Sequence, residues 1–316
     1  MRRPLQERHL SLKSRSPLSS AASARFASAL LVSGFALSQA QAQTVDNFNG
    51  GFRSDLAWSL QSPGANGTPV GTYDPAYLSF TGTELVLDPR SQTSLYGANN
   101  VPIDLPNLTV TSVPSSWFVE TSVQANYADL TNRTRFTQAD LHIYRDVDYF
   151  FSFTYGNVPN AATPQSQFST NVQTKANNST YGGYSTVGFA SNNNLQARMR
   201  IERKATGTVS DFVLGGTSSG IFIGINTGSG WQTIGEVSSS GNAQQQLAYA
   251  VLSQVTTGYH IGLSAADAPT PDTVVSARFD YIATNLGVAA APEPGALALL
   301  VLPFISTAVV RRRSHV

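Results

Sequence analysis

Carboxylates are the side chains with the clearest capacity for chemistry in the central part of this chain, residues 43–288. Cleavage of a glycosidic bond, for example, needs two of them roughly 5–9.5 Å apart, one acting as an acid and the other as a nucleophile or base. Glutamates are scarce in this part, and none stands two residues from an aspartate; they are Glu84, Glu120, Glu202 and Glu236. We therefore predict no catalytic carboxylate pair on a single strand and assign no catalytic residue.

Asp146 and Asp148 stand two residues apart, with Val147 between them. We interpret this segment as a hairpin turn, because an aspartate in a turn accepts hydrogen bonds from nearby backbone N–H groups. Two alternatives stay open. The pair can be catalytic, or its oxygens can hold Ca²⁺, which prefers oxygen ligands. No other metal site or cofactor is expected.

Two histidines lie in the central part, His142 and His260. They do not have His-x-His spacing, and the chain contains no cysteine, so no zinc site is predicted. Neither histidine stands near a plausible serine-nucleophile motif such as Gly-x-Ser-x-Gly, and no phosphate-binding glycine loop followed by Lys-Ser/Thr is present. We interpret both histidines as structural unless they join a binding surface.

A binding surface is more plausible than a catalytic one, because sugar rings stack on aromatic faces while polar side chains satisfy their hydroxyl groups. The candidates for such a site are Tyr144, Tyr155, Tyr181, Tyr184 and Trp231, with His142, Arg198 and Arg200 as polar partners. The alternative is that the aromatic residues belong to the core and the arginines to a solvated strand face.

Short segments of alternating apolar and polar residues predict the strands that must position these side chains. Leu195, Ala197, Met199 and Ile201, for instance, alternate with polar residues and predict one buried face. The predicted strands are 117–123, 140–145, 149–155, 195–203, 221–225, 231–237, 259–264 and 274–282. Residues 157–180 and 238–246 are polar and are predicted to be surface connections. The pattern predicts one all-β domain, a two-sheet antiparallel β-sandwich.

Charge divides the chain into a body and two ends. The full chain has a net charge of +1, but residues 43–290 hold 11 basic and 17 acidic residues, a net charge of −6. An acidic body argues against nucleic acid as a partner, because that affinity depends on neutralising phosphates. Without cysteine, stability must come from a conventional core.

Residues 1–42 have the layout of a secretory signal peptide. Basic residues precede the apolar stretch 26–37, and the small residues Ala40 and Ala42 follow it. We expect export by the general (Sec) pathway and cleavage after Ala42. The segment is therefore excluded from the predicted fold.

The C-terminal segment, residues 289–316, combines Pro292-Glu293-Pro294, an apolar stretch at 295–310 and the triplet Arg311, Arg312 and Arg313. This 16-residue stretch is near the lower limit for a transmembrane helix, which needs about 17 to 25 residues. The arrangement resembles the bacterial PEP-CTERM sorting signal, although Ala291 stands where many members have Val. The resemblance implies processing by an exosortase, a precursor held transiently in the inner membrane by a hydrophobic helix, and a final location in the cell envelope or extracellular matrix. An ordinary membrane anchor is the alternative.

The order of several segments in the body carries a second resemblance. They are "DNFNGGFRSDLAW", "FVETSV", "QADLHIYRDVDYFFSFTYG", "ARMRIERKATG", "GSGWQTIGEV", "YHIGLSAAD" and "ARFDYI". Together they resemble the concanavalin-A-like lectin/glucanase superfamily, especially its non-catalytic jelly-roll modules. The resemblance implies a jelly-roll sandwich over residues 43–288 and an exported protein that binds envelope or matrix polysaccharide. A secreted glycoside hydrolase or lyase of the same superfamily and a purely structural matrix component are the alternatives.

Overall fold

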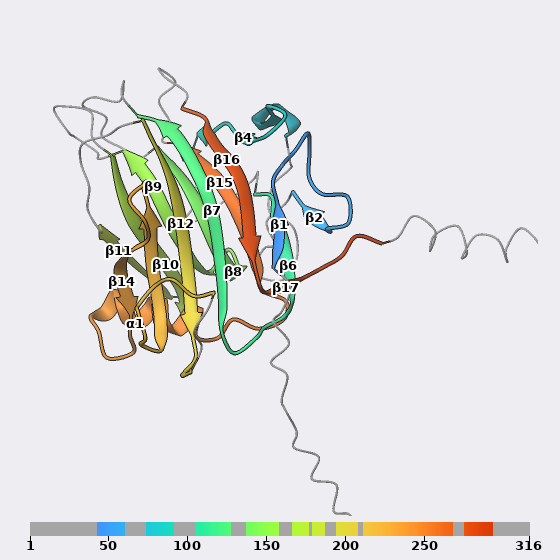
Figure 1. Ribbon diagram of the computed structural model, residues 1–316. Helices are drawn as coiled ribbons and strands as arrows, with labels where there is room; N and C mark the ends of the chain where they lie inside the picture. Colours follow the sequence, from blue (N-terminus) through green and yellow to red (C-terminus); the bar gives the residue numbers. More distant parts are fainter. Residues whose placement is uncertain are drawn as a thin grey trace, which may run out of the picture. The chain divides into compact units, whose positions relative to one another are not determined.

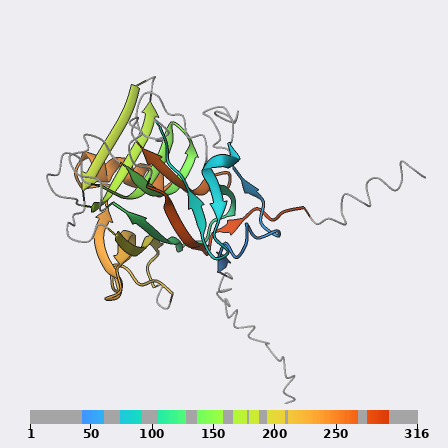
Figure 2. The ribbon, with the colours of Figure 1, turned by 90° about the horizontal axis from the view of Figure 1, so that it is seen from above.

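Two β-sheets dominate the part of the chain that the structure describes, which is a computed structural model (Figure 1). The described residues are 43–60, 74–91, 105–127, 137–157, 166–176, 179–186, 194–207, 211–267 and 275–292. The sheets pack face to face as an antiparallel sandwich, and Figure 2 shows the two layers from above. The all-β sandwich predicted from the alternating pattern is confirmed.

The first sheet has eight strands in the order β14–β13–β12–β7–β16–β4–β3, with β1 also paired to β16. Its strands are β1 (Thr44–Asp46), β3 (Leu78–Phe80), β4 (Leu85–Leu87), β7 (Trp117–Asn126), β12 (Asn194–Lys204), β13 (Gly220–Asn226), β14 (Gln232–Val237) and β16 (Ala277–Thr284). A short 3₁₀ helix, η1 (Pro75–Tyr77), precedes β3.

The second sheet has nine strands in the order β11–β10–β9–β8–β15–β6–β17, with β2 paired to β6 and β5 paired in parallel to β15. Its strands are β2 (Trp58–Ser59), β5 (Arg90–Ser91), β6 (Asn107–Ser112), β8 (Gln138–Asp146), β9 (Tyr149–Asn157), β10 (Ser166–Ala176), β11 (Ser179–Thr186), β15 (His260–Asp267) and β17 (Gly287–Val288).

The core lies between the sheets and is built by alternation along each strand. On β12, Met199 and Ile201 are fully buried in the core, whereas Arg198 between Ala197 and Met199 is exposed on the outer face. Leu141 and Ile143 on β8 contribute to the same core from the other sheet. The predicted strand faces are therefore confirmed for these segments.

Two predicted surface connections are wrong in part. Residues 166–176 form β10, which pairs with β9 and sets Phe168 opposite Tyr155 and Val172 opposite Phe151. Phe168 and Val172 are buried, but Ser169 and Asn171 on the opposite face are polar and also buried. The low hydrophobicity of this segment predicted a loop. The prediction failed because hydrophobicity does not distinguish a solvated polar residue from a buried polar residue with hydrogen-bond partners.

The second correction is helix α1 (Ala243–Leu252), which begins within the connection predicted at 238–246 and takes up its last four residues. Asn242 caps its first turn, and the Gln245 side chain returns a hydrogen bond to the Asn242 backbone, which completes a capping box. Ala248, Val251 and Leu252 are buried at helical spacing, and α1 packs against strands of both sheets at the lower end in Figure 1. The Asn-x-x-Gln pattern was the sequence signal for this helix.

The N-terminal segment is held beside β16 by the buried Asp46. Its carboxylate accepts hydrogen bonds from the backbone N–H groups of Phe48 and Arg53 and from the indole Nε1 of Trp58, each at 2.9 Å. Because β1 pairs with β16, this arrangement places Val45 and Asn47 next to the outer face of the eight-stranded sheet. The segment thereby supplies one side of the groove described below.

Candidate functional site

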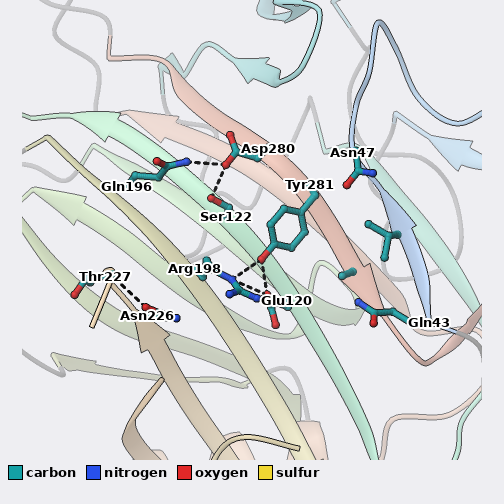
Figure 3. Close-up of a pocket in the computed structure, with 13 residues that line it drawn as sticks. Gln43, Asn47, Glu120, Ser122, Gln196, Arg198, Asn226, Thr227, Asp280 and Tyr281 are labelled. Carbon is teal, nitrogen blue, oxygen red and sulfur yellow. Dashed lines mark hydrogen bonds and ion pairs between the residues drawn. The ribbon is translucent and has the colours of Figure 1, made fainter. Parts of the chain in front are cut away.

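A groove of about 760 Å³ lies on the outer face of the eight-stranded sheet. Strands β1, β7, β12 and β16 and the turn after β13 provide its lining (Figure 3). The side chains at its centre are Glu120, Ser122, Gln196, Arg198, Asp280 and Tyr281. This volume is within the range of small-molecule sites, roughly 300–1,000 Å³.

A β-bulge in β16 brings two neighbouring residues to the groove. The register with β7 shifts between Phe279 and Tyr281, so that Phe279 faces Val123 while Tyr281 faces Ser122. Phe279 and Ile282 are buried, and Asp280 and Tyr281 both line the groove. In a regular strand these two would point to opposite faces, but a bulge redirects side chains. The bulge therefore creates the site.

Glu120 is buried at the centre of a network of donors. Arg198 Nε donates to its Oε1 at 3.0 Å, and Arg200 Nη1 donates to its Oε2 at 2.8 Å. The Tyr281 hydroxyl also donates to Oε1, and it accepts from Arg198 Nε at 2.8 Å. Burial raises the pKa of Tyr281, and the negative charge of Glu120 raises it further. Glu120 thus acts as an acceptor that fixes the two arginines and the tyrosine.

Asp280 has a different environment from Glu120. Its Oδ2 accepts from Ser122 Oγ at 2.8 Å and from Gln196 Nε2 at 2.7 Å, and both donors are neutral (Figure 3). Asp280 is half-buried and Gln196 is exposed. The carboxylate is therefore positioned but still borders the open groove.

Trp231, the residue before β14, lies beside the same network. The Arg198 guanidinium carbon is 5.0 Å from the Trp231 ring centroid, which is a cation–π distance. Trp231 is half-buried and Arg198 is exposed. Trp231 and Arg198, both predicted for sugar binding, are therefore brought together. They lie next to groove residues that were not predicted.

The segment 211–216 lies over the part of this sheet face that carries Arg200, Glu202 and Lys204 of β12. Arg200 Nη2 donates to Asp211 O at 2.7 Å, and the backbone N–H groups of Val213 and Leu214 donate to Glu202 at 3.2 and 3.3 Å. Lys204 Nζ donates to Leu214 O at 2.8 Å. Burial raises the pKa of Glu202, against the opposing charge of Arg200. Arg200, predicted as a polar partner for a sugar, is 5% exposed because it is enclosed by this segment.

A second polar cluster is buried on the outer face of the nine-stranded sheet. His142 Nδ1 is 2.6 Å from Ser152 Oγ, and its Nε2 is 2.7 Å from Ser264 Oγ. Asp140 accepts from Thr154 Oγ1 at 2.5 Å and from Ser264 Oγ at 3.2 Å. These contacts occupy both imidazole nitrogens with serine hydroxyls.

Burial determines the charge states in this cluster. It raises the pKa of Asp140 to about 6, against hydrogen bonds from Thr154, Ser264 and Gln138, and it lowers the pKa of His142 to about 3. His142 Nε2 is 4.0 Å from Asp140 Oδ2, but a neutral imidazole makes this contact dipolar rather than an ion pair. The cluster is consequently a neutral hydrogen-bonded network at mildly acidic pH.

Several predicted sugar-binding residues are not placed at a surface. Tyr144, Tyr155 and His142 are at most 1% exposed, so their ring faces present no area for stacking. Tyr181 and Tyr184 lie on β11, where the register sets them opposite Thr174 and Asn171 of β10. Their side chains are outside the described structure.

Asp146 and Asp148 form the turn between β8 and β9, as predicted. Asp148 N donates to Asp146 Oδ1 at 2.9 Å, and Arg145 Nε donates to Asp146 Oδ2 at 2.9 Å. Across the residues that the structure describes, no three His, Asp or Glu side chains gather closely enough to hold a metal ion. The calcium alternative is left to experiment.

The processing residues lie almost entirely outside the described part of the chain. This applies to Ala40, Ala42, Glu293, Pro294, Arg311, Arg312 and Arg313, whereas Pro292 is described and is the last residue of the described range 275–292. Within the described residues, no helix is long and apolar enough to cross a membrane. The apolar stretch 295–310 falls outside them.

The groove residues Glu120, Ser122, Gln196, Asp280 and Tyr281 were not predicted from the sequence. They come from three strands, so no local spacing connects them. One signal was present: Phe279 and Ile282 are three residues apart, and regular alternation of core residues needs an even spacing. That irregularity indicates a bulge, but it does not identify which residues the bulge faces.

No family model matches the chain, and no curated protein sequence matches it. Among solved structures it is similar to GH43B of the Bacteroides ovatus xyloglucan locus, with 12% identity, a TM-score of 0.40 and coverage of 67% of this chain and 34% of that one. The first three such structures are glycoside hydrolase family 43 proteins, and the chain spans only 34–40% of their length.

Two further similarities cover nearly the whole of the other protein. Endo-1,3-beta-glucanase from Streptomyces sioyaensis has 13% identity and a TM-score of 0.41, with 77% of this chain and 96% of that chain covered. Winged bean acidic lectin, solved with methyl-alpha-D-galactose, has 11% identity and a TM-score of 0.39, with 77% and 97% covered. At these TM-scores the similarities support no argument about activity. Any such argument must come from the groove itself.

Proposed function

We propose that this chain is an exported, non-catalytic β-sandwich protein that binds polysaccharide of the cell envelope or extracellular matrix in the groove on its eight-stranded sheet. The observation that carries the proposal is the composition of the groove. It combines neutral hydrogen-bonding side chains, such as Gln196 and Ser122, with the partly exposed Tyr281 ring. Sugar rings need this combination of aromatic surface and multiple polar partners.

Rigidity supports the same proposal. Tyr281 and Arg198 are held by hydrogen bonds to the buried Glu120, and the Arg198 guanidinium lies over the Trp231 ring. Side chains that are already ordered lose little conformational entropy when a ligand binds. Glu120 accepts from two arginines and a tyrosine, which is the role of a positioned carboxylate rather than of a proton donor.

Affinity electrophoresis of the purified full chain through gels containing a panel of polysaccharides tests the binding. We expect at least one polysaccharide to retard the protein. Gln196→Ala should weaken that binding about fivefold, because one hydrogen bond is worth about 1 kcal/mol. Gln232→Ala is the matched control, since Gln232 is also an exposed strand glutamine but does not line the groove. Absence of retardation by every polysaccharide, or equal effects of the two substitutions, would contradict the proposal.

A glycoside hydrolase or lyase is the second candidate, and one observation favours it. Glu120 and Asp280 lie on neighbouring strands and line the same groove, so the chain does present two carboxylates to one space. Release of reducing or unsaturated ends from the polysaccharide panel would support this candidate if Asp280→Asn abolished it and Asp146→Asn did not. Asp146 is the control because it belongs to the β8–β9 turn.

The proposal of export rests on the two ends of the chain. The expected cleavage after Ala42 lies two residues before β1 begins at Thr44, so a folded domain would start directly after the signal peptide. At the other end, Ala291 N donates to Asp55 O at 2.9 Å, and Pro292 of the proposed sorting signal follows immediately. The boundaries of the described domain are thus compatible with removal of both ends by signal peptidase and an exosortase.

Mass spectrometry of the protein from envelope and medium fractions tests the export proposal. We expect termini near Gln43 and near Pro294. Replacement of Pro292, Glu293 and Pro294 by alanine should leave the unprocessed precursor in the inner membrane. An unchanged C-terminus at Val316 in the wild type, or normal processing of the alanine variant, would overturn the sorting signal and favour an ordinary anchor.

A further inference from the structure

The charges in and beneath the groove do not balance. Glu120 pairs with both Arg198 and Arg200, and Arg200 also pairs with Glu202. In this connected set, two carboxylates are matched by two guanidinium groups. Asp280 stands outside the set, because its two hydrogen-bond donors are the neutral groups of Ser122 and Gln196. The excess charge of the groove is therefore negative and lies on Asp280.

The geometry of Asp280 leaves one of its oxygens available for a ligand. Within the described part of the chain, both hydrogen bonds to this carboxylate fall on Oδ2. Figure 3 shows the other oxygen turned away from Ser122 and Gln196. The two donors hold the carboxylate in place through neutral groups, so its charge remains available to a cation.

The positive charge of the groove is already engaged. Arg198 donates from Nε to Glu120 and Tyr281, donates from Nη2 to Glu120, and stacks over Trp231. Pairing with Glu120 already balances the charge of this guanidinium, which weakens its attraction for an acidic sugar. The acidic body, with a net charge of −6 over residues 43–290, also repels polyanions and attracts polycations at long range.

We propose that the groove prefers glycans that carry free amino groups, such as polymers of glucosamine, over acidic glycans and over their N-acetylated counterparts. The ammonium group of one sugar unit would donate to Asp280, while its hydroxyl groups contact the neutral side chains beside it. This inference rests on the proposed polysaccharide-binding function and specifies the chemical class of the ligand.

The test compares three probes on the full chain by calorimetry at mildly acidic pH, where sugar amines are protonated: the glucosamine hexamer, the N-acetylglucosamine hexamer and the galacturonate hexamer. We expect the glucosamine hexamer to bind about tenfold more tightly than the N-acetylated hexamer, because a charge-assisted hydrogen bond exceeds a neutral one. Asp280→Asn should remove this preference, because the neutral asparagine offers no charge-assisted hydrogen bond to the ammonium group.

Asp211→Asn is the matched control. Asp211 is an exposed carboxylate on the segment beside β12, and its backbone rather than its side chain accepts from Arg200. An equal loss in both variants would mean general charge attraction and would overturn the inference. Equal binding of the first two hexamers, or tighter binding of galacturonate, would overturn it while the proposed function stands. If the panel of polysaccharides and all three hexamers fail to bind, both proposals fail.

Discussion

The hydroxyl group of Tyr281 on β16 donates a hydrogen bond to the carboxylate of Glu120 on β7, so that a ring at the groove surface is tied to a buried charge on the neighbouring strand. The same carboxylate accepts from Arg198 and Arg200 on β12. Three adjacent strands are thereby joined by one side chain. The position of Tyr281, and with it the shape of the groove, depends on Glu120.

Glu120→Gln should destabilise the protein strongly, because Arg200, itself buried, would lose one of its two carboxylate partners. Removing one partner of a buried ion pair costs about 3–5 kcal/mol. Glu84→Gln is the matched control: Glu84 pairs with the exposed Arg278 at 3.4 Å, and a pair at the surface is worth about 1 kcal/mol or less. Urea denaturation measures both changes. Similar losses of unfolding free energy in the two variants would contradict the central role of Glu120.

The cluster of Asp140 and His142 predicts opposite pH dependences for two variants. The raised pKa of Asp140, about 6, means that its ionisation removes stability as the pH rises from the unfolded value toward 6. The lowered pKa of His142, about 3, means that stability is complete above its unfolded value and is lost as the pH falls. In the wild type these two effects offset each other between about pH 4 and pH 6.

Each substitution should therefore expose the contribution of the remaining group. Relative to the wild type, the stability of Asp140→Asn should rise with pH across this interval, and that of His142→Gln should fall. Each slope should reach at most about 1.4 kcal/mol per pH unit, the value for one proton. Urea denaturation at several pH values measures the slopes. Parallel pH profiles for the two variants would show that the residues do not titrate in these directions.

Gly224 on β13 is required where the 211–216 segment meets the sheet. A Cβ atom at this position would overlap the Leu214 side chain and lie 2.9 Å from Gln232 O. Because Leu214 is fully buried and Gln232 O is backbone, Gly224→Ala should cost about 1–3 kcal/mol by overpacking. Gly235→Ala on β14 is the control, since its nearest atom would be at 3.9 Å. Thermal unfolding compares the two, and a Gly235 variant as unstable as the Gly224 variant would refute the steric explanation.

Trp231 should report ligand binding by its fluorescence. The chain has three tryptophans, of which Trp117 is fully buried in the core and Trp58 lies in the N-terminal aromatic cluster. Trp231 alone among them contacts a groove residue, Arg198, in the described structure. A polysaccharide that binds should change the emission of the wild type, and Trp231→Phe should abolish that change. The same change in Trp231→Phe would place the ligand away from the groove.

Calcium should not stabilise the β8–β9 turn. The two oxygens of Asp146 already accept from Asp148 N and Arg145 Nε. We expect the melting temperature to be the same in Ca²⁺ and in a chelator, and Asp146→Asn to cost about 1 kcal/mol or less through the partly exposed ion pair. A rise in melting temperature with Ca²⁺ that Asp146→Asn abolishes would instead establish the calcium site.

The residues that alternate along single strands could be interpreted without a structure. Leu195 to Ile201 on β12 determine a core face and an outer face, because a strand has a period of two residues and only one of its faces is apolar. The Asp146–Asp148 turn was predictable for a similar reason. Each depends on residues that are neighbours in the chain.

The misinterpreted elements show where local pattern fails. In β10 the face opposite Phe168 carries Ser169 and Asn171, which are buried, so polarity suggested solvent where the structure has hydrogen-bond partners. In α1 only Ala248, Val251 and Leu252 form the buried face, which is too few residues for a sustained helical period. The partners that determine both elements lie on other strands: β10 pairs with β9 and β11, and α1 packs against β9, β10, β11 and β14.

The sequence by itself determined the all-β class and the two faces of the central strands. It also determined that the two ends differ from the body in charge and hydrophobicity. The tertiary structure alone decided the groove. Glu120, Arg198 and Asp280 come from β7, β12 and β16, and strand pairing is what brings them together. The bulge between Phe279 and Tyr281 then turns two consecutive side chains to one face. Register between distant strands is a property of the folded sheet, and no local spacing of residues encodes which side chains it will align.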